Sequence, residues 1–263
     1  MKTRIALAVA AIAAIAAVSA PAALADHSWG GYHWARQSNP FTLKLGDNVS
    51  GLWDGMLVTA SNDWTKSKVL DAPIVPGGTD ARRCNPTLGQ VEVCSYNYGG
   101  QQWLGVATIW ISGGHIVQGT VKNNDFYFGA SPYQYRYNNT AQMQHVICQE
   151  IGHIFGLDHQ DETGISLDTC MDYYHNTSAS DTQSTHPNEG DYDELLCIYD
   201  PASAGDTLTS RTGHSCTGTG HLDSTTTVGA AAFSPLASVR TSKFVTPLAG
   251  GAQMVTFVTW AGF

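Results

Sequence analysis

The sequence predicts a mixed α/β domain, because strand-like and helix-like patterns alternate along one part of the chain. Residues 90–128 contain three runs rich in β-branched and aromatic residues, separated by glycine pairs. Helix-like patterns flank these runs at 51–70 and 140–156. β-branched and aromatic runs favour strands, whereas apolar residues at a spacing of three or four favour amphipathic helices.

The N-terminal stretch 1–25 has the layout of a secretory signal peptide. Lys2 and Arg4 precede an apolar run at 5–18, and small residues follow at 23–25. The run is too short and too rich in alanine to favour a membrane span, although a retained anchor is the alternative. We therefore expect a secreted, extracellular protein that begins near Asp26 and has no membrane partner.

The remaining chain is acidic and contains six cysteines. Without Lys2 and Arg4 it has 11 Lys and Arg against 22 Asp and Glu, a net charge of about −11. This charge argues against nucleic acid as a partner. Cysteines in an exported chain favour disulfides, and Cys84 with Cys94 is the simplest pair. The pairing among the other four stays open: Cys148, Cys170, Cys197 and Cys216.

The first half of the domain is expected to contain one helix and four strands. Residues 41–49 alternate as an opening strand, and 51–70 show the spacing of an amphipathic helix. Prolines and a glycine pair at 73–78 end this helical unit. Three strands are then expected, at 90–98, 103–112 and 115–128.

The second half is expected to contain two helices around an irregular segment. Thr140 is a plausible N-cap and Gly156 a plausible stop for the helix at 140–156. Residues 157–189 are polar and irregular, and a short helix at 189–200 ends before Pro201. Beyond it, 201–263 is rich in Thr, Ser and Gly, and 252–262 has the pattern of one strand. This tail is either a small β appendage or partly disordered.

The string at 149–159 has the spacing of a metal site. Gln149 and His153 are four apart, so they lie on one helix face, with Glu150 beside them. A glycine at 156 lets the chain leave the helix and return, which brings His159 to the same point. Three ligands on one side leave the other side open for water, as a catalytic metal requires, and Glu150 is placed as the general base.

Gln149-Glu150-x-x-His153-x-x-Gly156-x-x-His159, followed by Met171, resembles the metzincin zinc metallopeptidases, whose usual string is HExxHxxGxxH with a methionine-containing turn. The glutamine variant is similar to the gametolysin-like branch, and "EIGHIFGLDH" to matrixin-type proteases. The resemblance covers 33–200 and implies an α/β (α+β) metzincin-like fold. Such a fold has a twisted mixed sheet, an active-site helix, a Met-turn and a C-terminal helix.

The same resemblance gives expected roles to the residues of the turn. Met171 matches the methionine that forms an apolar floor beneath the metal. A tyrosine two residues later reaches the metal or the oxyanion in several branches, and Tyr173 fits that spacing, with Tyr174 second. Packing in a core is the equally weighted alternative for Tyr173.

The histidine that is replaced by Gln149 has no substitute at His145. Eight residues of helix separate His145 from His153, a rise of about 12 Å, which excludes a shared ion. Gln149 therefore either binds zinc, or another divalent ion, through its amide oxygen, or belongs to a lapsed site. The loop residues His175, His186, Asp158, Asp161 and Asp168 have weaker patterns and favour solvated positions over ligand roles.

Two functions follow as hypotheses. The first is a secreted zinc-dependent endopeptidase that cleaves protein or peptide substrates with metal-activated water. The second is a catalytically inactive secreted binding protein on the same scaffold. In either case, the strand at 103–112 is expected to border the cleft and to pair with an extended peptide. The sequence shows no cysteine-switch string, and we expect no inhibitory segment before the domain.

Overall fold

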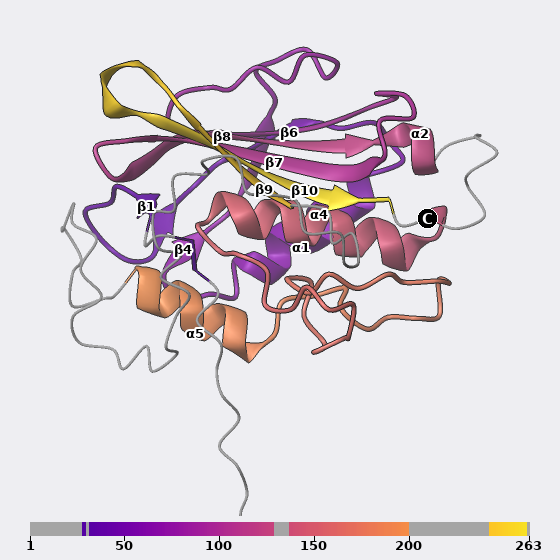
Figure 1. Cartoon of the computed structure of the whole chain (residues 1–263). Helices are drawn as coiled ribbons and strands as arrows, with labels where there is room; N and C mark the ends of the chain where they lie inside the picture. Colours follow the sequence, from indigo (N-terminus) through magenta and orange to yellow (C-terminus); the bar gives the residue numbers. More distant parts are fainter. Residues whose placement is uncertain (1–27, 30–31, 129–136, 200–241, 262–263) are drawn as a thin grey trace, which may run out of the picture.

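The computed structural model describes residues 28–29, 32–128, 137–199 and 242–261 (Figure 1). The expected signal peptide at 1–25 and most of the tail, including Cys216, His214 and His221, lie outside the described residues. Within the described part of the chain, no helix is long and apolar enough to cross a membrane.

A mixed sheet of eight strands forms the upper layer of the molecule (Figure 1). Seven strands follow the order β5-β3-β6-β8-β7-β10-β9, and β1 (His33–Trp34) pairs with β8. Their bounds are β3 Leu45–Asn48, β5 Ile74–Pro76, β6 Val91–Tyr96, β7 Trp103–Ser112, β8 His115–Asn124, β9 Lys243–Pro247 and β10 Gln253–Trp260. Strands β5, β3, β6 and β8 pair in parallel, whereas β7, β10 and β9 pair antiparallel. A second small sheet joins β2 (Phe41–Thr42) and β4 (Leu70–Asp71).

Two helices lie side by side beneath this sheet, α1 (Asp54–Trp64) and α4 (Thr140–Ile154) (Figure 1). Helix α4 packs against β7 and β8, and all its residues after Thr140 are buried. The buried face of β7 presents Ala107, Ile109 and Ile111 at alternate positions, as the strand period requires. Short helices complete the set: α2 (Asp125–Phe128), η2 (Ala249–Gly251) and α5 (Glu189–Ile198), which lies below α4.

The expected fold class is confirmed: a mixed sheet with an α4 helix, a methionine turn and a late helix. The elements differ most from the prediction in three places. The segment 41–49 forms two strands, β2 and β3, which lie in different sheets. The helix predicted at 51–70 ends at Trp64, because Val69 and Leu70 are buried beside the second sheet. The strand predicted at 115–128 stops at Asn124, where α2 begins.

The cap of α4 also differs from the prediction. Asn139, not Thr140, is the N-cap: its side chain accepts a hydrogen bond from the Gln142 amide at 2.9 Å. Asparagine is a strong N-cap because its side-chain oxygen satisfies a free backbone N–H of the first turn. At the other end, Gly156 has φ of +102° and ends the helical path, as predicted.

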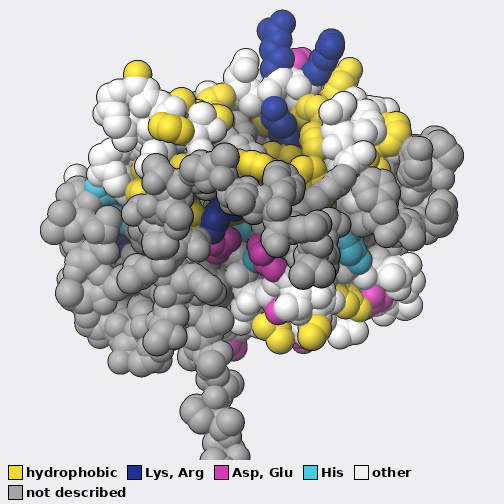
Figure 2. Space-filling model, viewed as in Figure 1, with side chains coloured by type: hydrophobic (Ala, Val, Ile, Leu, Met, Phe, Trp, Pro, Cys, Tyr) yellow, Lys and Arg dark blue, Asp and Glu magenta, His cyan; other side chains and the backbone are white. Residues whose placement is uncertain are grey.

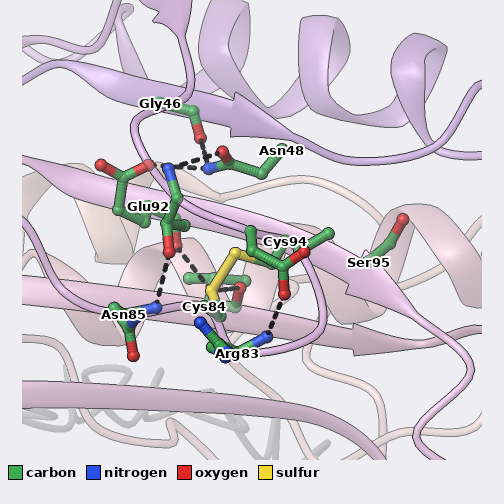
Figure 3. Close-up of a disulfide and its surroundings, with 12 residues drawn as sticks. Gly46, Asn48, Arg83, Cys84, Asn85, Glu92, Cys94 and Ser95 are labelled. Atoms are coloured by element: carbon green, nitrogen blue, oxygen red, sulfur yellow. Dashed lines mark hydrogen bonds between the residues drawn. A yellow bond between two sulfur atoms is a disulfide. The ribbon is translucent and has the colours of Figure 1, made fainter.

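Disulfides attach two loops to these layers. Cys84 and Cys94 are bonded as predicted, which ties the 77–90 loop to β6 (Figure 3). Beside this bond the buried Glu92 accepts hydrogen bonds from Asn48 and from the Gly78 amide, so the loop is fixed twice. Cys148 of α4 is bonded to Cys170, and Cys197 is also disulfide-bonded.

Candidate functional site

Helix α4 presents Gln149, Glu150 and His153 toward β7 and β10, and all three side chains are fully buried. The close approach of helix and sheet depends on Gly105 of β7. A Cβ atom at this position would lie 2.6 Å from Glu150 Oε1. A larger residue there would displace the carboxyl group, so the missing side chain of Gly105 makes room for Glu150.

The turn at Gly156 brings His159 back to the helix. A Cβ atom at Gly156 would lie 2.6 Å from the Tyr32 carbonyl, and its positive φ is unfavourable for other residues. Because the chain doubles back there, His153 Nε2 and His159 Nε2 lie 3.0 Å apart. The structure thus brings together the two histidines that the sequence predicted to converge.

The other nitrogens of these two rings contact hydrogen-bond acceptors. His153 Nδ1 lies 2.9 Å from the Leu157 carbonyl oxygen, and His159 Nδ1 lies 2.8 Å from Glu162 Oε1. These contacts orient both rings so that the Nε2 atoms face each other. Two imidazoles that are oriented in this way by acceptors on Nδ1 can hold one metal ion through Nε2.

The carboxylate of Glu162 reinforces this arrangement. The hydrogen bond from His159 lowers the pKa of Glu162 to about 2, and a bond from Ser242 acts in the same direction. An ionised carboxylate on the outer nitrogen of a histidine is a common support for metal-binding imidazoles. This role was not predicted from the sequence, although Glu162 follows His159 at a spacing of three.

Gln149 turns its amide oxygen inward. Its Nε2 donates to the Asp172 carbonyl at 2.7 Å, which fixes the orientation of the amide group. The Oε1 atom lies 2.5 Å from the Thr259 hydroxyl of β10, and the same hydroxyl lies 2.5 Å from Glu150 Oε1. Thr259 was not predicted, because its contact with Gln149 spans 110 residues of sequence.

The surroundings of Glu150 favour the uncharged, protonated form of its carboxyl group. Burial raises the pKa of Glu150 to about 8, and hydrogen bonds from Thr259 and Ala107 partly oppose this rise. A hydroxyl has one proton to donate. We therefore assign the proton between Glu150 and Thr259 to the carboxyl group, and the Thr259 proton to the bond with Gln149.

The turn containing Met171 lies directly beneath α4. A Cβ atom at Gly152 would lie 2.4 Å from Met171 Sδ, so this glycine lets the fully buried methionine pack against the helix. The Cys148–Cys170 disulfide holds the same turn. His145 bonds to Asn176 and to the Asp172 carbonyl, which occupies both ring nitrogens and places it in packing rather than at the histidine pair.

Tyr173, rather than Tyr174, lies at this site. Its ring meets the His159 ring edge-on at 5.0 Å between centroids. Its hydroxyl donates to the Val258 carbonyl at 2.9 Å and accepts from the Trp260 amide at 2.6 Å. The Tyr174 hydroxyl instead bonds to Asp181.

The residues present fit a tetrahedral zinc ion. Two ligands at zinc–nitrogen bonds of about 2 Å lie about 3.3 Å from each other, close to the observed separation of the Nε2 atoms. Glu150 Oε2 is buried, and no hydrogen bond satisfies it. Over the described residues, no three His, Cys, Asp or Glu side chains converge as a metal-binding group.

Figure 2 shows acidic, basic and histidine side chains together near the middle of one face, with hydrophobic side chains above them. Of the residues weighed as weak ligand candidates, Asp158 pairs with Lys243 at 2.5 Å and His186 pairs with Asp63 at 2.6 Å. These two pairs account for Asp158 and His186 without a metal.

Comparison with known proteins gives low similarity to solved structures. No family model and no curated protein matches the chain. Among solved structures, archaemetzincin from Archaeoglobus fulgidus, complexed with malonate, is similar at 14% identity and a TM-score of 0.32. The match covers 59% of this chain and 99% of that one. A similarity of this size carries no argument about chemistry.

Proposed function

We propose that this protein is a secreted zinc-dependent endopeptidase, with residues 33–200 as its catalytic domain. The observation that carries the proposal is the convergence of two imidazole nitrogens, His153 Nε2 and His159 Nε2, 3.0 Å apart, with the buried carboxyl group of Glu150 on the same helix. Two imidazole nitrogens at this separation can bind one zinc ion. The disulfides of the chain support secretion, since such bonds persist in oxidising compartments.

Three residues would hold the ion: His153 and His159 through Nε2, and Gln149 through Oε1. Imidazole suits zinc well, whereas a neutral amide oxygen is a weaker donor that also accepts other divalent ions. When bound, zinc would supply Lewis acidity to a water molecule and a peptide carbonyl.

Glu150 would act as the general base. It takes a proton from the attacking water and then gives this proton to the nitrogen of the leaving amine. This role requires the ionised form of Glu150, and a cation bound beside it would favour that form by lowering the pKa that burial has raised.

Tyr173 would stabilise the negative charge that develops on the carbonyl oxygen. Its hydroxyl already donates to a peptide carbonyl, that of Val258, on the side of β10 that faces away from β7. A donor aimed at this oxygen lowers the barrier to attack.

The test combines metal content with hydrolysis of an unstructured protein substrate. We expect one zinc per chain after dialysis against zinc, and Glu150→Ala to lower hydrolysis by about 10²–10⁴-fold without loss of the metal. Glu189→Ala, an exposed glutamate at the start of α5, is the matched control and should behave as wild type. A site that binds no zinc contradicts the proposal.

A binding protein without catalysis is the second candidate, and one observation favours it: an extended strand, β10, is already bound along β7. In that case the wild type and Glu150→Ala would both fail to cleave with any divalent ion. Zinc binding without cleavage by either protein therefore supports the second candidate.

A further inference from the structure

Strand β10 occupies the position expected for a peptide substrate. The strand at 103–112 was predicted to pair with an extended peptide, and β7 covers these residues. In the structure β10 pairs antiparallel with β7 from Gln253 opposite Ile111 to Trp260 opposite Trp103. The edge of β7 is therefore filled along its length by a segment of the same chain.

The contacts of β10 centre on the proposed catalytic residues. The Thr259 hydroxyl reaches both Gln149 and Glu150 at 2.5 Å. Phe257 is fully buried and stacks on the His153 ring at 4.2 Å between centroids. No substrate carbonyl can reach Glu150 while Thr259 and Phe257 hold these places.

Tyr173 closes the other side of β10. It bonds to the Val258 carbonyl and to the Trp260 amide, which flank Thr259. One edge of β10 is thus paired with β7 and the other edge is bonded to Tyr173. The side chain of Thr259 points at Glu150. A bound peptide would be held in the same way, by main-chain hydrogen bonds on both sides.

The first residue of β9 and the residue before it are attached to the loop that carries His159. Ser242 donates to Glu162 at 2.7 Å, and Lys243 bonds to Asp158 at 2.5 Å. The Val258 amide donates to the Ser242 carbonyl at 2.8 Å, so β9 and β10 form one unit around the site.

We propose that residues 242–260 are a built-in inhibitor, in which β10 lies in the substrate position until it is displaced. This inference rests on the proposed function, because it names what regulates the same site. A tethered segment competes at an effective concentration of about millimolar, so it excludes most free peptides without any tighter contact.

The first test weakens the inner face of β10 in the full chain. Val255→Ser with Phe257→Ser removes two fully buried apolar side chains of this strand. Phe244→Ser with Val245→Ser changes the same residue types on β9, where they are 45% and 42% exposed, and is the matched control. The probe is a fluorescently labelled peptide with the sequence of residues 252–261, and its anisotropy reports binding.

We expect the inner double variant to bind the peptide at least about 10-fold more tightly than the wild type, because the tethered competitor is weakened. The outer double variant should bind as the wild type does. Equal affinity in all three folded proteins would overturn the inference. Circular dichroism in the near ultraviolet shows whether each variant is folded.

A reversible disulfide between β7 and β10 tests the same proposal if the inner double variant does not fold. Thr108 and Thr256 are opposite each other on β7 and β10, with their hydroxyl oxygens 3.4 Å apart. Even-numbered residues of β10 bond toward β9, as Val258 does, so this pair has the short spacing that suits a disulfide. Thr108→Cys with Thr256→Cys should bind peptide at least about 10-fold more weakly when oxidised than after mild reduction, since the bond prevents displacement.

Wild type under the same treatments controls for effects on the native disulfides. Equal binding before and after reduction would overturn the inference. Because the readout is binding, it separates the two proposals. If peptide binding follows the expected pattern but no variant cleaves with zinc supplied, the inhibitor stands and the peptidase fails. If the wild type cleaves but all the proteins bind the peptide equally, the peptidase proposal stands and the inhibitor proposal fails.

Discussion

At the scale of single residues, Gln149 distinguishes this site, because it stands where the usual metal-binding string has histidine. Its amide is oriented by the bond to the Asp172 carbonyl, so the oxygen faces Glu150 and Thr259. The position on α4 that the spacing assigned to a ligand therefore faces the site in the structure. The amide is the weakest donor of the proposed set, and its strength is testable.

Gln149→His should tighten zinc binding by about 10–100-fold, because imidazole is a better donor than a neutral amide. Competition with a chelator of known zinc affinity measures the change. Gln101→His, at an exposed position before β7, controls for an added histidine and should leave the affinity unchanged. Equal or weaker binding in the folded Gln149 variant would show that this side chain does not reach the ion.

At the scale of elements, α4 and the turn beneath it fit together through one glycine. The Cβ of any residue at 152 would meet Met171 Sδ at 2.4 Å and the Trp64 ring at 2.8 Å, and both side chains are fully buried. Neither can move outward without opening the core. The packing of helix on turn thus depends on the absence of a side chain.

Gly152→Ala should lower the free energy of unfolding by about 1–2 kcal/mol, since overpacking of about 1–3 kcal/mol exceeds the gain in helix propensity. Gly55→Ala, in the first turn of α1 with no atom within 4 Å of the new Cβ, is the control. It should instead gain up to about 1 kcal/mol. Urea denaturation measures both, and a Gly152 variant as stable as the control would contradict the packing described here.

The elements also show what the sequence can and cannot predict. The helix at 140–156 and the convergence of Gln149, Glu150 and His153 follow from local spacing, so they were predictable. The end of α1 could not be predicted in this way. Val69 and Leu70 continue the apolar pattern, but they are buried because Leu70 pairs with Phe41 in a second sheet. Nor could the role of Thr259 be predicted, since the pairing of β10 with β7 joins residues 148 positions apart at Thr108 and Thr256.

At the scale of the whole molecule, two disulfides close loops with different consequences. The Cys84–Cys94 bond spans 10 residues and fixes a loop on β6, away from the histidine pair. The Cys148–Cys170 bond spans 22 residues and joins α4 to the Met171 turn. Both bonds restrict the unfolded chain, but only the second also holds the proposed metal site.

Replacing either cysteine pair by alanine should cost about 2–4 kcal/mol of unfolding free energy. Zinc affinity separates the two pairs. Cys148→Ala with Cys170→Ala should weaken zinc binding, because the turn beneath His153 is released, whereas Cys84→Ala with Cys94→Ala should leave it unchanged. The same zinc affinity in both folded variants would show that the turn keeps its place without the bond.

The distance in sequence between α4 and β10 has a consequence for how the protein is assembled. Chains are synthesised from the N-terminus at about 5–20 residues per second. Thr259 is 110 residues later than Gln149, so it leaves the ribosome about 5–20 s after the helix residue that it contacts. Until then β7 has an unpaired edge, which is the feature most prone to join other chains. The newly made protein therefore has a short period in which the edge of β7 can pair with other chains. Pairing with β10 ends this period.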